Sequence, residues 1–185
     1  MKAINNINFS KLKINDIDGR PVEIGSGKKV WLSLFREANC PFCNFRVYEL
    51  THKFKDISQL NIEIVAVFNS DKEMINKFIA KHPRPFRMVS DKAGDLHRNI
   101  NLKSSRWGKI KAMMLRLHRL LRGMKYTGIA GMRTNNIMPA DILLDEYGEV
   151  VSSYFGTDVG DHVPMEQVVS FARKRSNKGN RNEEN

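Results

Sequence analysis

The sequence predicts an α/β fold in which a central mixed sheet is flanked by helices. Two nearly unbroken apolar runs, 29–35 and 61–68, are typical of strands that are buried on both faces. A helical pattern over 40–58 connects them, so these three segments predict a parallel βαβ unit. A hairpin signal around Asp145-Glu146-Tyr147-Gly148 and a last helical pattern over 163–175 complete the sheet and its helical cover.

The other elements are expected from turn and cap signals. In order, we expect a short hairpin over 9–24 with its turn at Asp18-Gly19-Arg20-Pro21, a helix from Asp71 to His82-Pro83, a short strand at 86–89, a brief helix that Asp91 caps and that ends at Ile100, and hairpin strands at 140–144 and 149–155. We expect one domain over 1–175, with an insertion at 103–134 and a disordered polar tail at 176–185.

The two cysteines of the chain lie three residues apart in Cys40-Pro41-Phe42-Cys43, where the first buried strand gives way to the first helix. A thiol pair at this spacing and place is typical of reversible dithiol–disulfide chemistry. Proline is favoured at the first helical position, so Pro41 makes Cys40 the N-cap of the helix. Free N–H groups of the first turn and the helix dipole then favour the Cys40 thiolate.

Charges near the motif act on the same thiolate. Arg36 and Arg46 are expected to lower the pKa of Cys40, and Glu37 opposes them. We therefore expect Cys40 to be the attacking thiolate and Cys43 to be the more buried resolving thiol. His162 is a further candidate, since it could protonate a leaving thiolate as a partner of Asp161; a helix-capping role is the more common one for such a histidine.

Two other interpretations of the cysteines stay open, namely inert buried thiols and part of a metal site. A structural zinc site needs four ligands, and the chain has no second cysteine pair. The histidines show no ligand-like spacing either; they are His52, His82, His97, His118 and His162. We expect neither a metal nor an organic cofactor.

The predicted order of a βαβ unit, a hairpin and a final helix is thioredoxin-like. Folds of this kind carry a cis-proline that faces the thiols at the start of the hairpin, so we predict a cis peptide between Met138 and Pro139. The exposed backbone of Met138 would then hold an extended substrate against Cys40. Pro139 as a simple strand start is the alternative.

Three segments resemble peroxiredoxin-like proteins of the AhpC/TSA superfamily: 35–44, 138–145 and 154–164. The resemblance covers about 7–173 and implies a thioredoxin fold with thiol-dependent antioxidant or disulfide-exchange activity. Peroxiredoxins carry a Pro-x-x-x-Thr-x-x-Cys motif. Aligned on Cys43, this chain has Cys40 at the threonine and Arg36 at the proline. A peroxiredoxin-like order would make Cys43 peroxidatic and Cys40 resolving, the reverse of the order expected from the helix start.

The stretch 103–133 contains nine basic residues and no acidic one, which accounts for +9 of the net charge of +11. Its apolar residues have helical spacing; they are at 107, 110, 113, 114, 117, 120, 121 and 124. We expect one basic amphipathic helix that packs its apolar stripe on the domain or across a homodimer interface. Binding of 106–125 to an anionic membrane is a second interpretation, and binding of an acidic protein or a nucleic acid a third. Nucleic acid is not favoured, because nothing in the pattern reads bases.

The sequence predicts a thiol-disulfide oxidoreductase that cycles between a dithiol and a Cys40–Cys43 disulfide. Its substrate would be a protein or small-molecule disulfide, or a peroxide, with a reductase or small thiol as electron donor. The alternatives are a thiol peroxidase and a non-catalytic membrane- or protein-binding module. No apolar run reaches the ~18–20 residues that cross a bilayer, so a cytoplasmic, at most membrane-peripheral, protein is expected.

Overall fold

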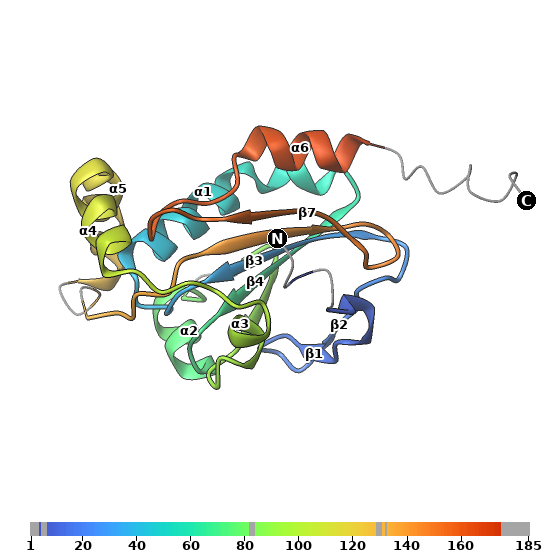
Figure 1. Cartoon of the computed structure of the whole chain (residues 1–185), viewed down its shortest axis with the longest axis horizontal. Helices are drawn as coiled ribbons and strands as arrows, with labels where there is room; N and C mark the ends of the chain where they lie inside the picture. The colour runs from blue at the N-terminus through green and yellow to red at the C-terminus, as the bar shows by residue number, and fades with distance from the viewer. Residues whose placement is uncertain (1–3, 5–6, 82–83, 129–130, 132, 175–185) are drawn as a thin grey trace, which may run out of the picture.

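A computed structural model describes residues 4, 7–81, 84–128, 131 and 133–174 (Figure 1). Five strands form one mixed sheet in the order β5-β4-β3-β6-β7. Their bounds are β3 Lys29–Phe35, β4 Ile62–Phe68, β5 Arg87–Ser90, β6 Ala140–Leu144 and β7 Val150–Phe155. The three strands β3, β4 and β5 are parallel, and β6 is antiparallel to both β3 and β7. This is the predicted mixed sheet, with the βαβ unit at its centre.

Helices cover both faces of the sheet, which explains why β3 is buried along its whole length. The side chains of Trp31 and Phe35 belong to the cluster that also holds α1 (Pro41–Ser58), α2 (Lys72–Phe78) and α6 (Met165–Arg173). Figure 1 shows α1 and α6 over the same face of the sheet. Leu32 and Leu34 face the other way, toward α3 (Asp95–Asn99) and the N-terminal segment.

Both predicted hairpins are present, and an aspartate organises each turn. β1 (Ile14–Asn15) and β2 (Pro21–Val22) pair antiparallel after a short 3-10 helix at Phe9–Lys11. Asp16 Oδ1 accepts the N–H groups of Asp18 at 3.0 Å and Arg20 at 2.9 Å. Between β6 and β7, Asp145 Oδ1 accepts the N–H groups of Tyr147 and Glu149, both at 2.9 Å.

Two predicted helix boundaries are wrong. Asp71 caps α2 as expected, but the helix ends at Phe78, and His82-Pro83 lie outside the described residues. The N-cap of α3 is Gly94 in the left-handed region, and not Asp91. The Asp91 carboxylate still accepts a backbone N–H of the first turn, that of His97 at 3.0 Å, together with the ring Nδ1–H of His97 at 2.5 Å. The predicted tail at 176–185 also lies outside the described residues.

The insertion forms two helices where one was predicted: α4 (Arg106–Leu115) and α5 (Leu117–Thr127). Arg116 separates them with φ −122° and ψ 33°, which is not a helical conformation. Its side chain forms ion pairs with Asp158 at 3.1 Å and Asp161 at 3.2 Å in the segment after β7. This tertiary contact accompanies the break, and the bend lets α5 lie against α1 at the left of Figure 1.

Candidate active site

Cys40 is the N-cap of α1, with extended backbone at φ −69° and ψ 125°, and Pro41 is the first helical residue, as predicted. Cys40 and Cys43 are both free thiols whose side chains hydrogen-bond to each other. Both are buried, Cys40 being 0% and Cys43 1% exposed. The expected difference in solvent access between the two thiols is therefore absent in this dithiol form.

Two glycines let the insertion close over the cysteine motif. A Cβ at Gly123 in α5 would lie 2.0 Å from the carbonyl oxygen of Pro41. A Cβ at Gly131 would lie 2.4 Å from the carbonyl oxygen of Asn39. Neither distance is compatible with a larger residue, so α5 and the segment after it touch the backbone on both sides of Cys40. Glycine inside an otherwise helical pattern was the available signal at position 123.

Arg36 is the charged group next to the sulfur. Its Nη1 donates to Cys40 Sγ at 3.3 Å, and the side chain is only 1% exposed. Nη2 holds the guanidinium in place by donating to Thr134 Oγ1 at 2.8 Å and to the carbonyl oxygen of Asn135. Its Nε is buried and has no hydrogen-bond partner among the described residues. Thr134 and Asn135 were not identified from the sequence, because only the fold brings their segment to Arg36.

The two thiols have very different acidities. Burial acts to raise the pKa of Cys40, but the Cys43 thiol, the positive charge of Arg36 and the N–H groups of Phe42 and Cys43 together lower it to about 6. Burial, the hydrogen bond to Cys40 and the negative charge of the Cys40 thiolate raise the pKa of Cys43 well above its usual value. At neutral pH the pair is thus a Cys40 thiolate beside a protonated Cys43 thiol.

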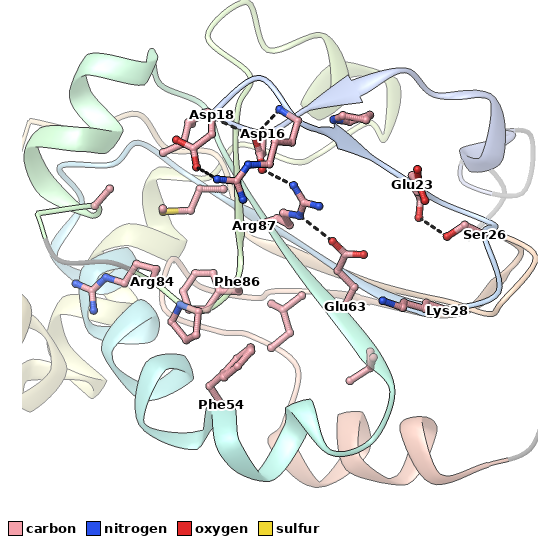
Figure 2. Close-up of a pocket in the computed structure, with 18 of the residues that line it drawn as sticks. Asp16, Asp18, Glu23, Ser26, Lys28, Phe54, Glu63, Arg84, Phe86 and Arg87 are labelled. Atoms are coloured by element: carbon pink, nitrogen blue, oxygen red, sulfur yellow. Dashed lines mark hydrogen bonds and ion pairs between the residues drawn. The ribbon is translucent and has the colours of Figure 1, made fainter.

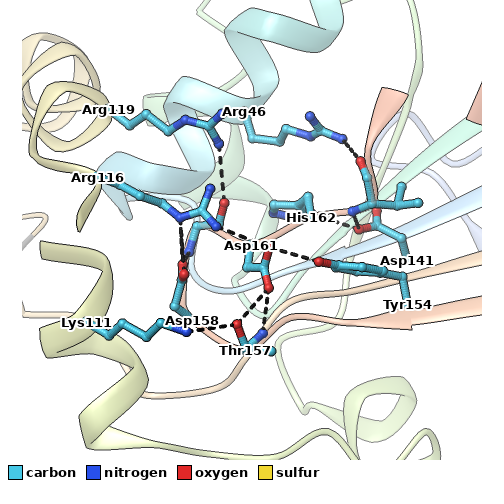
Figure 3. A network of polar contacts seen from close by, with 12 residues as sticks. Arg46, Lys111, Arg116, Arg119, Asp141, Tyr154, Thr157, Asp158, Asp161 and His162 are labelled. Atoms are coloured by element: carbon cyan, nitrogen blue, oxygen red, sulfur yellow. Dashed lines mark hydrogen bonds and ion pairs between the residues drawn. The ribbon is translucent and has the colours of Figure 1, made fainter. Parts of the chain in front are cut away.

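Arg46 and His162 lie around a buried carboxylate, Asp141, as Figure 3 shows. Arg46 donates to the carbonyl oxygen of Val163 at 2.8 Å, and its guanidinium lies 5.7 Å from the centre of the Trp31 ring. His162 Nδ1 is 3.1 Å from Asp141 Oδ2. Arg46 and His162 therefore contact Asp141 and the residues around it. Of the three predicted thiolate-tuning residues, Arg36 is the one that hydrogen-bonds to the Cys40 sulfur.

The predicted pair of Asp161 with His162 is not formed. Asp161 instead accepts the Tyr154 hydroxyl at 2.9 Å and the N–H of Thr157 at 2.8 Å, and it pairs with Arg116 (Figure 3). It therefore belongs to the contacts that hold the insertion to the domain.

Asp141 is the site residue whose role the sequence did not reveal. It is 0% exposed, and Oδ1 accepts Trp31 Nε1–H at 2.9 Å and the Ser33 hydroxyl at 2.6 Å. Burial acts to raise its pKa, but the His162 imidazole, Arg46 and the hydrogen-bond donors hold it at about 2. A charged residue inside the apolar run 140–144 was the signal, since a buried carboxylate needs partners from other elements.

The predicted cis peptide between Met138 and Pro139 is wrong, because this bond is trans. Trans is the more stable form of an X–Pro bond by about 0.5–1 kcal/mol. The Met138 N–H donates to the carbonyl oxygen of Lys103 at 2.8 Å, so it is not available to a substrate. The Met138 side chain lies against α4, where a Cβ at Gly108 would be 2.8 Å from its sulfur. Met138 thus anchors the insertion in this form of the protein.

A cavity of about 990 Å³ lies at the other end of the sheet, near the β1–β2 hairpin (Figure 2). Arg87 in its wall is paired with Asp16 at 2.5 Å and with Glu63 at 3.0 Å. None of the residues that line this cavity belongs to the cysteine motif. In the part of the chain that the structure describes, no three Cys, His, Asp or Glu side chains gather so that they could hold a metal ion.

The fold and the site define a class of protein. A thiolate at a helix start, a protonated second thiol three residues later, and a mixed sheet in the order β5-β4-β3-β6-β7 make this chain a thioredoxin-like, thiol-dependent oxidoreductase.

Within this class the chain belongs to the AhpC/TSA family, whose model matches residues 5–153. Solved structures with the same fold include peroxiredoxin Q from Xanthomonas campestris, at 15% identity and TM-score 0.59, over 89% of this chain and 91% of that one. The peroxidoxin BcpB of Mycobacterium tuberculosis is 14% identical with TM-score 0.61, over 88% and 91%. A putative thiol:disulfide interchange protein DsbE from Chlorobium tepidum is 19% identical with TM-score 0.57, over 87% and 92%. No curated protein matches the sequence.

Among the described residues, no helix is both long enough and apolar enough to span a membrane.

Proposed function

We propose that this oxidoreductase works by thiol–disulfide exchange, with Cys40 as the attacking thiolate and Cys43 as the resolving thiol. The observation that carries the proposal is the opposite shift of the two pKa values, to about 6 for Cys40 and well above the usual value for Cys43. A nucleophilic thiol must be ionised at working pH, and a resolving thiol is best kept protonated until its turn.

In the first step the Cys40 thiolate attacks one sulfur of a substrate disulfide. A mixed disulfide forms, and the other substrate sulfur leaves as a thiolate that takes up a proton. Loss of the Cys40 charge removes the main reason for the high pKa of Cys43, apart from burial. Cys43 then loses its proton and attacks Cys40 Sγ, which releases the second substrate thiol and leaves a Cys40–Cys43 disulfide. A reductase or small thiol returns two electrons.

Access to Cys40 requires movement of the covering segment, since the thiol is 0% exposed. Among the described residues the cover consists of α5 with Gly123, of Gly131 and of Asn135, which lie against Pro41, Asn39 and Arg36 respectively. Substrate binding would have to displace these contacts before exchange.

Thiol peroxidase activity is the second candidate function, and one observation favours it. The buried Nε of Arg36 has no partner among the described residues, and a peroxide oxygen next to Cys40 would supply one. In that reaction the thiolate attacks one peroxide oxygen, the other leaves as an alcohol or water, and the resulting sulfenic acid condenses with the second thiol to release water. The raised pKa of Cys43 argues against Cys43 as the peroxidatic residue.

We also propose an antioxidant role in the cytoplasm, where reductants keep thiols reduced. The support is chemical, because a single thiol pair must be returned to the dithiol after every turnover. Growth of cells that lack the protein, with and without added peroxide or disulfide stress, tests this role.

The deciding experiment is stopped-flow reduction of a model disulfide and of hydrogen peroxide by the wild type, Cys40→Ser and Cys43→Ser. We expect Cys40→Ser to lose both reactions. Cys43→Ser should react once with the disulfide and accumulate a mixed disulfide at Cys40, which mass spectrometry of the trapped protein detects. Full turnover by both single variants would refute redox catalysis by this pair. Peroxide reduction that survives Cys40→Ser but not Cys43→Ser would reverse the assigned roles.

A further inference from the structure

The exposed apolar side chains of this protein are concentrated on the insertion. Among the described residues eleven large apolar side chains are exposed, and seven of them lie on α4 and α5. The seven are Trp107 at 79%, Met114 at 76%, Leu115 at 68%, Leu121 at 56%, Leu117 at 53%, Ile110 at 47% and Tyr126 at 45%. A concentration of this kind on one element marks an interaction surface.

The orientation of α4 explains the exposure. Trp107, Ile110 and Met114 are spaced i, i+3, i+7 and share one face of the helix. The residues buried against the domain are the small ones, Gly108 and Ala112. α4 therefore packs through its small side and presents its large apolar side outward, the opposite of the predicted packing. Gly108 permits this close packing, since a Cβ there would lie 2.8 Å from the Met138 sulfur.

The basic residues of α4, α5 and the Arg116 link between them fall into two groups. Lys109, Arg116 and Arg119 are half-buried: Lys109 donates to the carbonyl oxygen of Thr134 at 2.9 Å, Arg116 pairs with Asp158 and Asp161, and Arg119 lies 3.7 Å from Glu49. The contacts of Arg116 and Arg119 hold the insertion to the domain. Figure 3 shows Arg116 with its partners Asp158 and Asp161.

The second group is exposed, and its members are Arg106, Lys111, Arg122 and Lys125. No acidic residue occurs between 103 and 133 to balance them.

We propose that the outer surface of α4 and α5 docks on an anionic lipid bilayer, with the apolar side chains in the interface and the exposed basic residues at the headgroups. Apolar residues with an exposed tryptophan beside lysine and arginine are the composition that binds such surfaces. A second copy of the chain fits poorly, because a symmetric contact would bring two uncompensated basic surfaces together. A nucleic acid would engage the charges but leave Trp107 and Met114 in water.

The fluorescence of Trp107 can report this docking. Of its two tryptophans, Trp31 is 0% exposed and donates to Asp141, whereas Trp107 is 79% exposed. Full-length protein is mixed with vesicles of phosphatidylcholine alone, or of phosphatidylcholine with phosphatidylglycerol, at low and high salt. We expect co-sedimentation and a blue shift of tryptophan emission only with the anionic vesicles, with binding weakened by salt.

Two double variants test the two parts of the surface. Arg122→Glu with Lys125→Glu should lower vesicle affinity about thirtyfold or more, since each basic residue near an anionic surface contributes about a factor of five. Met114→Ser with Leu115→Ser should lower it on the order of tenfold or more. The matched controls are Lys13→Glu with Lys72→Glu for charge, and Val151→Ser with Phe155→Ser for exposed apolar area. Circular dichroism and disulfide turnover verify that each variant is folded.

Four results would overturn the proposal. They are no binding to anionic vesicles at low salt, equal binding to neutral vesicles, equal loss in the controls and the test variants, and a blue shift produced by DNA or polyglutamate but not by vesicles. Light scattering that shows a dimer with Trp107 already shielded in the free protein would assign the surface to a second copy instead. Each result is independent of thiol turnover, so failure here leaves the redox proposal intact.

Discussion

Replacing Arg36 by glutamine should raise the pKa of Cys40 and slow its reaction at neutral pH. Arg36 Nη1 lies 3.3 Å from the sulfur, and at an effective dielectric constant of about 20 a unit charge pair at that distance interacts by about 5 kcal/mol. Part of this is offset by burial of the guanidinium, and opposite charges at such range typically shift a pKa by about 1–3 units. We expect a rise of about two units from the present value of about 6.

That rise corresponds to about 3 kcal/mol of lost thiolate stabilisation. At pH 7 the thiolate fraction would fall from about nine-tenths to about one-tenth, so the rate of alkylation by iodoacetamide should fall roughly tenfold. The assay measures this rate against pH, with ultraviolet absorbance of the thiolate as an independent titration. Arg36→Lys keeps the charge and should restore most of the low pKa, which separates electrostatics from a local folding defect.

Arg46→Gln is the matched control, because Arg46 is equally close to the motif in sequence but contacts Val163, Glu49 and Trp31. It should leave the Cys40 titration in place. An unchanged Cys40 titration midpoint in Arg36→Gln, or an equal rise of that midpoint in Arg46→Gln, would refute a direct electrostatic role of Arg36.

Three further outcomes follow from the same contacts. Gly123→Ala should push α5 away from Pro41, which should destabilise the protein by about 1–3 kcal/mol and speed alkylation of Cys40. Leu121→Ala, on the exposed side of α5, should change neither the stability nor the alkylation rate. Urea unfolding measures the stability, and iodoacetamide measures the alkylation rate. Asp141, whose pKa is depressed to about 2 from 3.8, contributes about 2 kcal/mol above pH 4 that is lost as pH falls toward 2, so Asp141→Asn should flatten the acid limb of urea-derived stability between these values. Because the pKa of Cys40 is depressed, the free energy of unfolding of the reduced protein should rise between about pH 6 and pH 9. In Cys40→Ser this rise should be absent. The same rise in the variant would show that another group is responsible.

Much of the fold was predictable because its determinants are local. Strand β3 agrees with the expectation to the residue, since an unbroken apolar run between polar segments can be satisfied only by burial on both faces. The start of α1 was equally predictable, because Pro41 can occupy the first helical turn but not the interior. From these two facts alone Cys40 falls at the helix N-cap, where the thiolate is favoured.

The insertion was predicted less well, for a physical reason. Its apolar spacing predicts a continuous amphipathic helix, and α5 does bury Leu120 in the expected way. The spacing does not show that Arg116 forms ion pairs with Asp158 and Asp161, and the helix is interrupted at Arg116. Nor does the spacing show that α4 packs against Met138 through Gly108, with its large apolar side outward.

The thiol site likewise has features that the local sequence determines and features that only the fold determines. By itself the sequence determined that the protein has a redox-competent thiol pair at a strand–helix junction, because spacing, proline and helix start all lie within four consecutive residues. Only the tertiary structure decided which charges act on the pair. Arg36 reaches Cys40 because Thr134 and Asn135, about a hundred positions away, hold its guanidinium. His162 lies beside Asp141 instead of the thiols, because His162 follows β7 and β7 is the neighbour of β6. Electrostatic effects depend on distances of a few ångströms between groups far apart in the chain, and such distances exist only after folding.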